Sequence, residues 1–303
     1  MAFDGITIAC MAHELNEKLN GGRISKIAQP EADELLLTVK SQQGNFRLLL
    51  SASASLPLIY ITENNKPGPL TAPNFCMLLR KHINGGRILS ITQPSLERIL
   101  RFEVEHLDEM GDLCRKYLVV EIMGKHSNII FCNDQDMIID SIKHVSSQMS
   151  SVREVLPGRP YFIPDTQEKA DPLSIQEDAF ITLINSKAVK LSRALYTSLT
   201  GLSPVAAEEI CHLASLDSDR SANTYEPEEL IHLYRTFCRY LEPIKNGSYR
   251  PVIYYDGKNP VEFSCLPLSI YDHHHQEHYK PCLLHLSADH SCISVYHYSR
   301  EYR

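Results

Sequence analysis

The sequence lacks tryptophan, and none of its apolar runs approaches the roughly 18 residues that cross a bilayer. Its start has no basic stretch followed by an apolar core, and Asp4 stands where a secretory signal would be basic. Its nine cysteines form no CxxC pair and show no regular spacing, which favours reduced thiols over a disulfide framework. These absences predict a cytoplasmic protein with no membrane partner.

Motifs of the common self-contained enzymes are missing as well. The chain has no G-x-x-x-x-G-K-[ST] loop, no G-x-S-x-G turn and no H-E-x-x-H helix, so nucleotide hydrolysis, serine hydrolysis and zinc protease chemistry lack support. Seven of the 14 histidines fall between His273 and His297, with Cys282 and Cys292 nearby, but without the spacing that preorganises zinc ligands. We expect no catalytic residue, no metal and no cofactor.

The chain is acidic, with a formal net charge of -7 from 37 acidic and 30 basic side chains. Phosphate binding draws on clustered Lys and Arg, so attraction of nucleic acid by the whole protein is excluded. Any RNA contact must therefore be local. The length of 303 residues allows two or three parts with a sizeable core.

One motif occurs twice. Asn-Gly-Gly-Arg-Ile, followed five residues later by Gln-Pro, spans 20–30 and again 84–94, an offset of 64 residues. Each copy follows a stretch with helical apolar spacing, 6–19 or 75–83, and glycine after a helix adopts the left-handed backbone that ends it. Because strand-like runs come next, each copy predicts helix, glycine stop and strands, and the two units are expected to close one antiparallel sheet by pseudo-symmetry.

The rest of the chain divides at prolines. Further strands are predicted over 117–122 and 128–132, and the proline-rich stretch 157–172 ends the sheet domain. Helical periodicity follows, and strand-like runs then return and are expected to rejoin the first sheet. The helices are predicted over 175–184, 188–199, 204–214 and 227–241, and the returning strands over 252–255 and 263–270. The predicted class is α+β, with a mixed domain over 1–170, a helical domain over 171–243 and return strands in 244–303.

Comparison of the two copies singles out one pair of side chains. Aligned on Gln-Pro, Asp33-Glu34 of the first copy stands opposite Glu97-Arg98 of the second, so only the second has an arginine. Such a pair is either an ordinary surface ion pair or an arginine fork for phosphate or a base edge beside an acid that accepts from a base amine.

Polar groups elsewhere have the same two interpretations. Lys125, His126 and Asn128 suit a phosphate or base contact, or form a solvated turn, and Arg159 is a further candidate RNA contact. The tract 201–204, Gly-Leu-Ser-Pro, predicts a capped helix start that either holds a phosphate or simply connects two helices.

Several tracts match one family together. They are 1–6, His13-Glu14-Leu15 before Gly-Gly-Arg-Ile, Glu97-Arg98, the tract 121–128 and Leu156-Pro-Gly-Arg-Pro-Tyr. Over about residues 1–270 the chain thus resembles the NFACT family of ribosome quality-control factors. The resemblance implies an N-terminal domain similar to that of formamidopyrimidine-type DNA glycosylases, followed by a helix-hairpin-helix domain. It also implies that the chain is an N-terminal fragment whose last segment, within 244–303, begins a truncated arm.

The resemblance further implies a function. Such a factor binds a large ribosomal subunit that holds a stranded peptidyl-tRNA, contacts rRNA and recruits alanyl-tRNA, so that an alanine tail is added without mRNA. Peptide transfer is then the ribosome's own reaction. By position, Asp4 matches an early acid and Glu97 with Arg98 an acid-arginine pair needed for tailing, although the family acid is usually Asp. Three further residues match a strand end that contacts tRNA in the family: Glu121, Ile122 and Met123.

Two other functions stay open. Family members have been labelled fibronectin-binding, which suggests a surface adhesin, but the chain shows no signal, anchor or adhesive repeat. A glycosylase would attack through an N-terminal proline amine beside a glutamate, and Ala2 and Phe3 occupy those positions here. Glycosylase activity is therefore not expected.

Overall fold

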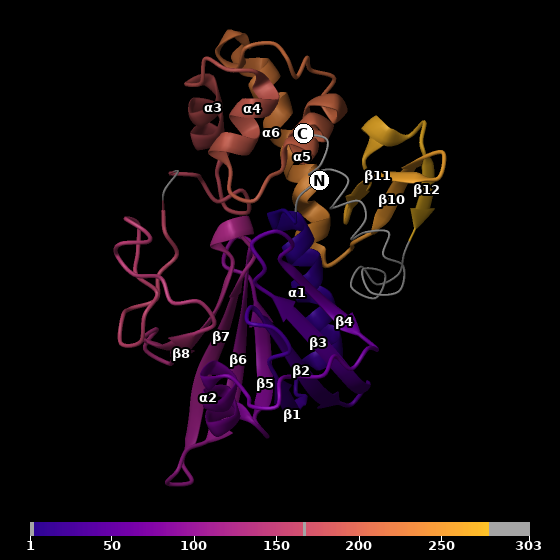
Figure 1. Ribbon diagram of the computed structural model, residues 1–303. Helices are drawn as coiled ribbons and strands as arrows, with labels where there is room; N and C mark the ends of the chain where they lie inside the picture. The colour runs from indigo at the N-terminus through magenta and orange to yellow at the C-terminus, as the bar shows by residue number, and fades with distance from the viewer. Residues whose placement is uncertain (1–2, 166–167, 279–303) are drawn as a thin grey trace.

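The computed structural model describes residues 3–165 and 168–278. A large sheet with two helices lies below a helical part, and a small second sheet lies beside that part (Figure 1). No helix in the described ranges is both long and apolar enough to cross a membrane. Of the last predicted segment, 244–303, which includes the start of an arm, residues 279–303 lie outside the described residues, and so do three of the seven histidines between His273 and His297.

The large sheet has nine antiparallel strands in the order β4-β3-β2-β1-β5-β6-β7-β8-β9. Strands of one motif copy fill one half, and strands of the other copy fill the other half. The strands are β1 Arg23–Ala28, β2 Glu34–Ser41, β3 Gly44–Ser51, β4 Leu58–Thr62, β5 Arg87–Thr92, β6 Ile99–Leu107, β7 Leu113–Glu121, β8 Asn128–Asn133 and β9 Ile138–Ser141.

The two motif copies meet at the centre of this sheet. Arg23 of β1 pairs with Arg87 of β5, and the flanking hydrogen bonds are reciprocal. Gly21 N–H donates to Ile88 O at 2.7 Å, and Gly85 N–H donates to Ile24 O at 2.7 Å. Both of these glycines have a positive φ, 76° and 81°, which side-chain-bearing residues rarely adopt. The predicted pseudo-symmetric sheet is confirmed.

Helices α1 (Gly5–Leu19) and α2 (Asn74–Ile83) precede the two copies, as predicted. Helix α1 is buried on nearly all sides because it packs on strands β2, β5 and β6 and against α6 of the helical part. This placement brings the first residues of α1 to the junction between the sheet and the helical part (Figure 1).

The helical part contains four helices, close to the predicted ranges. They are α3 Glu177–Asn185, α4 Leu191–Ser198, α5 Pro204–Leu213 and α6 Pro227–Asn246. The prediction that the last helix ends at Leu241 is wrong, since α6 continues through Pro243 to a left-handed cap at Gly247. A proline in the last turn removes one hydrogen bond, and here the helix continues despite that loss.

In the described part of the chain after α6, up to residue 278, no strand joins the first sheet. Strands β10 (Val252–Asp256), β11 (Asn259–Ser264) and β12 (His275–His278) form a separate sheet in the order β11-β10-β12. Val252, Tyr254 and Leu268 cluster against Val205 of α5, so packing on the helical part decides where this sheet lies. The predicted strand over 263–270 is wrong in its bounds, because β11 ends at Ser264.

Candidate functional site

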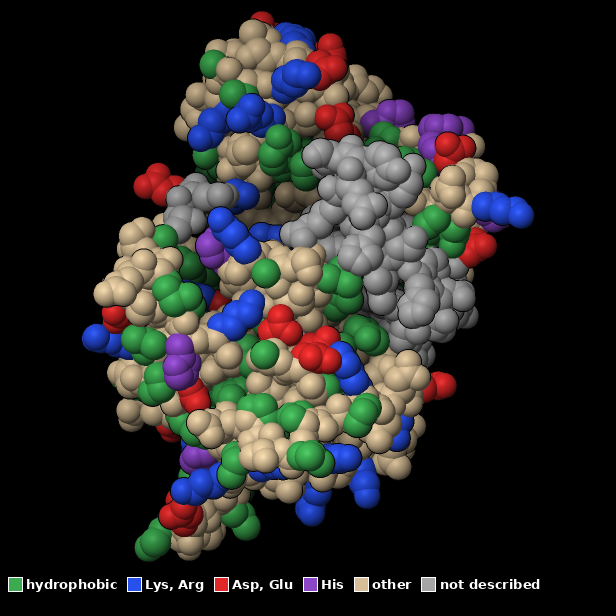
Figure 2. All heavy atoms as spheres, viewed as in Figure 1, with side chains coloured by type: hydrophobic (Ala, Val, Ile, Leu, Met, Phe, Trp, Pro, Cys, Tyr) green, Lys and Arg blue, Asp and Glu red, His purple; other side chains and the backbone are tan. Residues whose placement is uncertain are grey.

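A cleft of about 840 Å³ separates the end of the large sheet from the helical part. Figure 2 shows the surface hollowed there, with Lys, Arg and His side chains at its edges. The structure places most of the predicted site residues in its lining: Asp4, Glu97, Arg98, Met123, Lys125, His126 and Asn128. Three predicted residues are not part of the lining: Glu121, Ile122 and Arg159.

A tight turn before β6 presents Glu97 and Arg98. Ser95 has a left-handed φ of 51°, and its hydroxyl donates to Asp171 Oδ1 at 2.6 Å. The Gln93 amide donates to the backbone oxygens of Gly5 and Glu97, both at 2.8 Å. The glutamine of the second motif therefore ties the turn to the start of α1.

Glycines let three segments meet under this turn. A Cβ on Gly5 would lie 1.9 Å from Leu96 O, and a Cβ on Gly201 would lie 2.0 Å from the same oxygen. Gly5 N–H donates to Gly201 O at 2.9 Å, which joins α1 to the helical part. The position of the Glu97-Arg98 turn thus depends on contacts between three distant parts of the chain.

The two side chains of the pair differ in environment. Glu97 is partly buried, and desolvation raises the pKa of its carboxyl, while Lys169 and then Arg98 act in the opposite direction. Arg98 is exposed and has no side-chain hydrogen bond or ion pair within the described ranges. An uncommitted guanidinium beside a half-buried acid is available to bind phosphate or a base edge.

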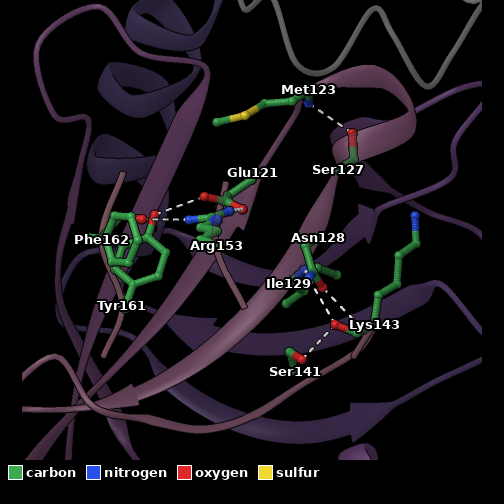
Figure 3. A network of polar contacts seen from close by, with 10 residues as sticks. All are labelled: Glu121, Met123, Ser127, Asn128, Ile129, Ser141, Lys143, Arg153, Tyr161 and Phe162. Carbon is green, nitrogen blue, oxygen red and sulfur yellow. Dashed lines mark hydrogen bonds and ion pairs between the residues drawn. The ribbon is translucent and has the colours of Figure 1, made fainter. Parts of the chain in front are cut away.

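The turn between β7 and β8 forms a second edge of the cleft. Lys125 and His126 are exposed on the short helix η1 (Gly124–His126), and Lys125 also has no partner among the residues the structure describes. Asn128 differs, because its amide donates to Lys143 O at 3.0 Å and its Oδ1 accepts from Ile129 N–H at 2.9 Å (Figure 3). Asn128 shapes the cleft, and its amide is already engaged within the protein.

Glu121 also acts inside the protein. Its side chain is fully buried, forms an ion pair with Arg153 and accepts a hydrogen bond from the Tyr161 hydroxyl at 3.0 Å (Figure 3). Burial raises the pKa of Glu121, while Arg153 and Tyr161 oppose that rise. Ile122 is buried too, and its N–H donates to Arg98 O at 2.8 Å. The strand end therefore positions Arg98 and Arg153, and of its three predicted residues only Met123 faces the cleft.

Asp4 is a helix cap at the junction. Its carboxylate accepts from Thr7 N–H at 2.9 Å at the start of α1 and from the Ser203 hydroxyl. Ser203 in turn caps α5 by accepting from Ala206 N–H at 3.3 Å. Burial raises the pKa of Asp4 against these hydrogen bonds. The tract 201–204 is thus a capped helix connection, which is one of the two interpretations left open by the sequence.

Arg159 lies apart from these residues. Its Nε is 2.8 Å from Glu154 Oε2, in an exposed surface ion pair outside the cleft lining. Such a pair leaves the guanidinium partly accessible but away from the other candidate residues.

Three cationic side chains of the lining were not identified from the sequence: Lys143, Arg153 and Lys169. Burial lowers the pKa of Lys143, whose ammonium donates to Ala52 O, and that of Lys169, which donates to Tyr196 O at 3.1 Å. Each lies in an irregular segment far along the chain from Arg98. No motif or periodicity marks them.

The lining as a whole is basic in an acidic chain. Its cations are Arg98, Lys125, Lys143, Lys169 and Arg153, the last already paired with Glu121, against the acids Asp4, Glu97 and Asp165. Clustered cations beside apolar groups suit the phosphates and bases of RNA. The cleft thus supplies the local basic surface that the net charge of the whole chain does not.

Comparison with known proteins identifies the family. The sequence model of the family described as NFACT N-terminal and middle domains matches residues 4–287. The chain belongs to the NFACT family. The Rqc2 homolog RqcH of Bacillus subtilis is 42% identical over 217 residues, which are 71% of this chain and 38% of that protein. The RqcH of Streptococcus suis is 35% identical over 72% of this chain and 39% of its own length. The chain thus spans about two-fifths of the curated relatives it matches.

Solved structures agree with this assignment. The N-terminal part of the fibronectin/fibrinogen-binding protein from Streptococcus suis aligns with a TM-score of 0.74 at 29% identity, covering 99% of this chain and 100% of that chain. The fibrinogen-binding protein from Staphylococcus aureus aligns with a TM-score of 0.77 at 27% identity, covering 95% of this chain and 98% of that chain. The α+β prediction is confirmed at the level of the whole fold, and its glycosylase-like detail stays a prediction.

Proposed function

We propose that this chain is the N-terminal part of a ribosome-associated quality-control factor and that its cleft positions tRNA. The factor binds large ribosomal subunits obstructed by a peptidyl-tRNA, contacts rRNA and recruits alanyl-tRNA in the cytoplasm. Alanine is then added to the stalled chain without mRNA, and the ribosome performs peptide transfer. The names of the relatives support the quality-control role, since one is called Ribosome quality control complex subunit NEMF.

One observation carries the tRNA part of the proposal. The exposed Arg98 lies beside the half-buried Glu97 at a cleft whose other edge carries Lys125, and neither cation has a side-chain hydrogen bond or ion pair with a residue that the structure describes. Cationic side chains whose N–H donors are not used within the protein can donate them to phosphate. The equivalent positions of the first motif copy, Asp33 and Glu34, provide no cation.

The test replaces the pair in the full-length protein. We expect Glu97→Ala with Arg98→Ala to abolish alanine tailing and to reduce the tRNA that co-purifies, without a change in the unfolding midpoint. The matched control is Lys190→Ala with Asp219→Ala, which also removes one base and one acid from an exposed pair at 2.6 Å but outside the cleft. Unchanged tailing and tRNA recovery in the first variant would refute the assignment.

The names of the structural relatives favour one alternative, a surface adhesin that binds fibronectin or fibrinogen. Surface labelling of intact cells, compared with co-sedimentation of the protein with large ribosomal subunits, separates the two functions. Protein found only in the surface-labelled fraction would overturn the ribosomal proposal.

A further inference from the structure

The hairpin between β6 and β7 extends beyond the rest of the large sheet. Pairing of β5 with β6 ends at Glu105, and pairing of β8 with β7 ends at Lys116. Beyond these residues the two strands pair only with each other among the described strands, as far as Leu107 and Leu113. Figures 1 and 2 show this hairpin projecting from the molecule at the end opposite the helical part. It is therefore free to enter another molecule while the cleft is occupied.

The tip, residues 107–113, exposes three large apolar side chains. Leu107 and Leu113 are each 65% exposed, and Met110 between them is 87% exposed. The two leucines are direct cross-strand partners, so their side chains lie on the same face of the hairpin. Exposed apolar groups gathered at one place mark interaction sites more often than scattered ones do.

The tip is also held in one conformation. The Asp108 carboxylate accepts from the N–H groups of Met110 at 2.8 Å and Asp112 at 2.9 Å, and Gly111 has a φ of 86°. The Glu109 carboxylate lies 2.9 Å from Lys81 Nζ of α2, in an exposed ion pair that adds little to the order of the tip. Because the loop is ordered before it binds, little entropy is lost when its apolar side chains are buried.

The charge of the tip selects the kind of partner. Residues 107–113 contain three acids, Asp108, Glu109 and Asp112, and no Lys or Arg. Lys81 of α2 compensates Glu109, and Asp108 and Asp112 leave the tip with a net negative charge that disfavours the phosphates of RNA and the headgroups of anionic lipids and favours a basic protein surface. A small apolar projection with an acidic rim is complementary to an apolar pocket with a basic rim.

We propose that the hairpin tip docks into an apolar pocket with a basic rim on a protein of the large ribosomal subunit. The inference rests on the proposed function and adds to it a second contact, remote from the cleft. The cleft holds tRNA through cations, and the tip holds the subunit through apolar side chains and acids.

The first test compares two matched double variants of the full-length protein. We expect Leu107→Ser with Leu113→Ser to weaken binding to large subunits about tenfold or more, because both apolar anchors are lost. The control, Leu70→Ser with Leu213→Ser, removes two other exposed leucines and should change binding by no more than about twofold. Both variants should recover tRNA normally in the absence of subunits. Equal subunit binding by the two variants would overturn the inference.

Charge reversal and cross-linking distinguish the possible occupants. If the tip contacts a basic protein, Asp112→Lys should weaken binding to the large subunit. If the tip contacts RNA, the same substitution would strengthen that binding. A photo-cross-linker at Met110 should join a subunit protein within a Lys- or Arg-rich segment. Cross-links to RNA, to a second copy of this chain or to a protein outside the ribosome would each overturn the inference, and so would the absence of any cross-link.

Failure of the proposed function would look different. In that case the unmodified protein would bind neither large subunits nor tRNA.

Discussion

Removal of Arg153 tests whether Glu121 stabilises the fold through a buried ion pair with Arg153. Glu121 is fully buried and Arg153 is 10% exposed, so the Arg153→Met variant leaves a carboxylate without its cation in a place that water does not reach. Breaking a buried pair in this way costs about 3–5 kcal/mol of the free energy of unfolding. The Tyr161 hydroxyl remains as a hydrogen-bond donor and limits the loss to the lower part of that range.

A second variant supplies the reference for this cost. Glu121→Leu with Arg153→Met removes both charges and leaves the Tyr161 hydroxyl without its acceptor, which costs about 1–3 kcal/mol. Together with Glu121→Leu alone, the variants form a double-mutant cycle, and we expect a coupling free energy of about 2 kcal/mol or more. Urea unfolding followed by far-UV circular dichroism measures each free energy.

The pH dependence gives an independent check. In the unmodified protein Arg153 opposes the rise that burial causes in the Glu121 pKa, so the pKa rises further when Arg153 is removed. The folded state then binds a proton more tightly than the unfolded state, so stability falls as pH rises through the raised pKa and is kept below the ordinary pKa of a glutamate. The Arg153→Met variant should therefore lose less stability at pH 5.5 than at pH 8. A coupling below about 0.5 kcal/mol, or a loss independent of pH, would show that the pair is not an internal buried contact.

Two further predictions concern the junction under the candidate site. Gly201→Ala places a methyl group 2.0 Å from Leu96 O at a φ of 78°, so we expect a clear fall in the unfolding midpoint, and an unchanged midpoint would contradict the close approach. Gln93→Ala removes two hydrogen bonds that hold the Glu97 turn and should reduce tRNA recovery and cost about 1–3 kcal/mol. The control Gln29→Ala removes the single bond of its counterpart in the first copy, and equal tRNA recovery by the two variants would exclude a positioning role for Gln93.

Local sequence features predicted much of the architecture. The glycines of the repeated motif need a left-handed backbone, and the β-branched residues after them favour strands, so helix, stop and strand followed from each copy alone. The pairing of the copies through Arg23 and Arg87 agrees with the symmetry that the repeat predicted. The helices of the second part were also found, because their apolar spacing and capping residues lie within a few turns of each other.

The candidate site depended more on the tertiary structure. The comparison of the two copies singled out Glu97 and Arg98, but it did not predict that Lys143, Arg153 and Lys169 join them in one cleft. Those residues come from irregular segments that are brought together by packing between the sheet and the helical part, which leaves no local pattern.

The sequence by itself determined which residue types are present and which local backbone they favour. Only the tertiary structure decided the direction in which each side chain points. The tract 121–128 shows the difference, since Lys125 is exposed at the cleft while Glu121 is fully buried against Arg153 and the Asn128 amide is engaged by Lys143. Burial and pairing are set by what packs against a residue from elsewhere in the chain, and neighbouring sequence does not contain that information.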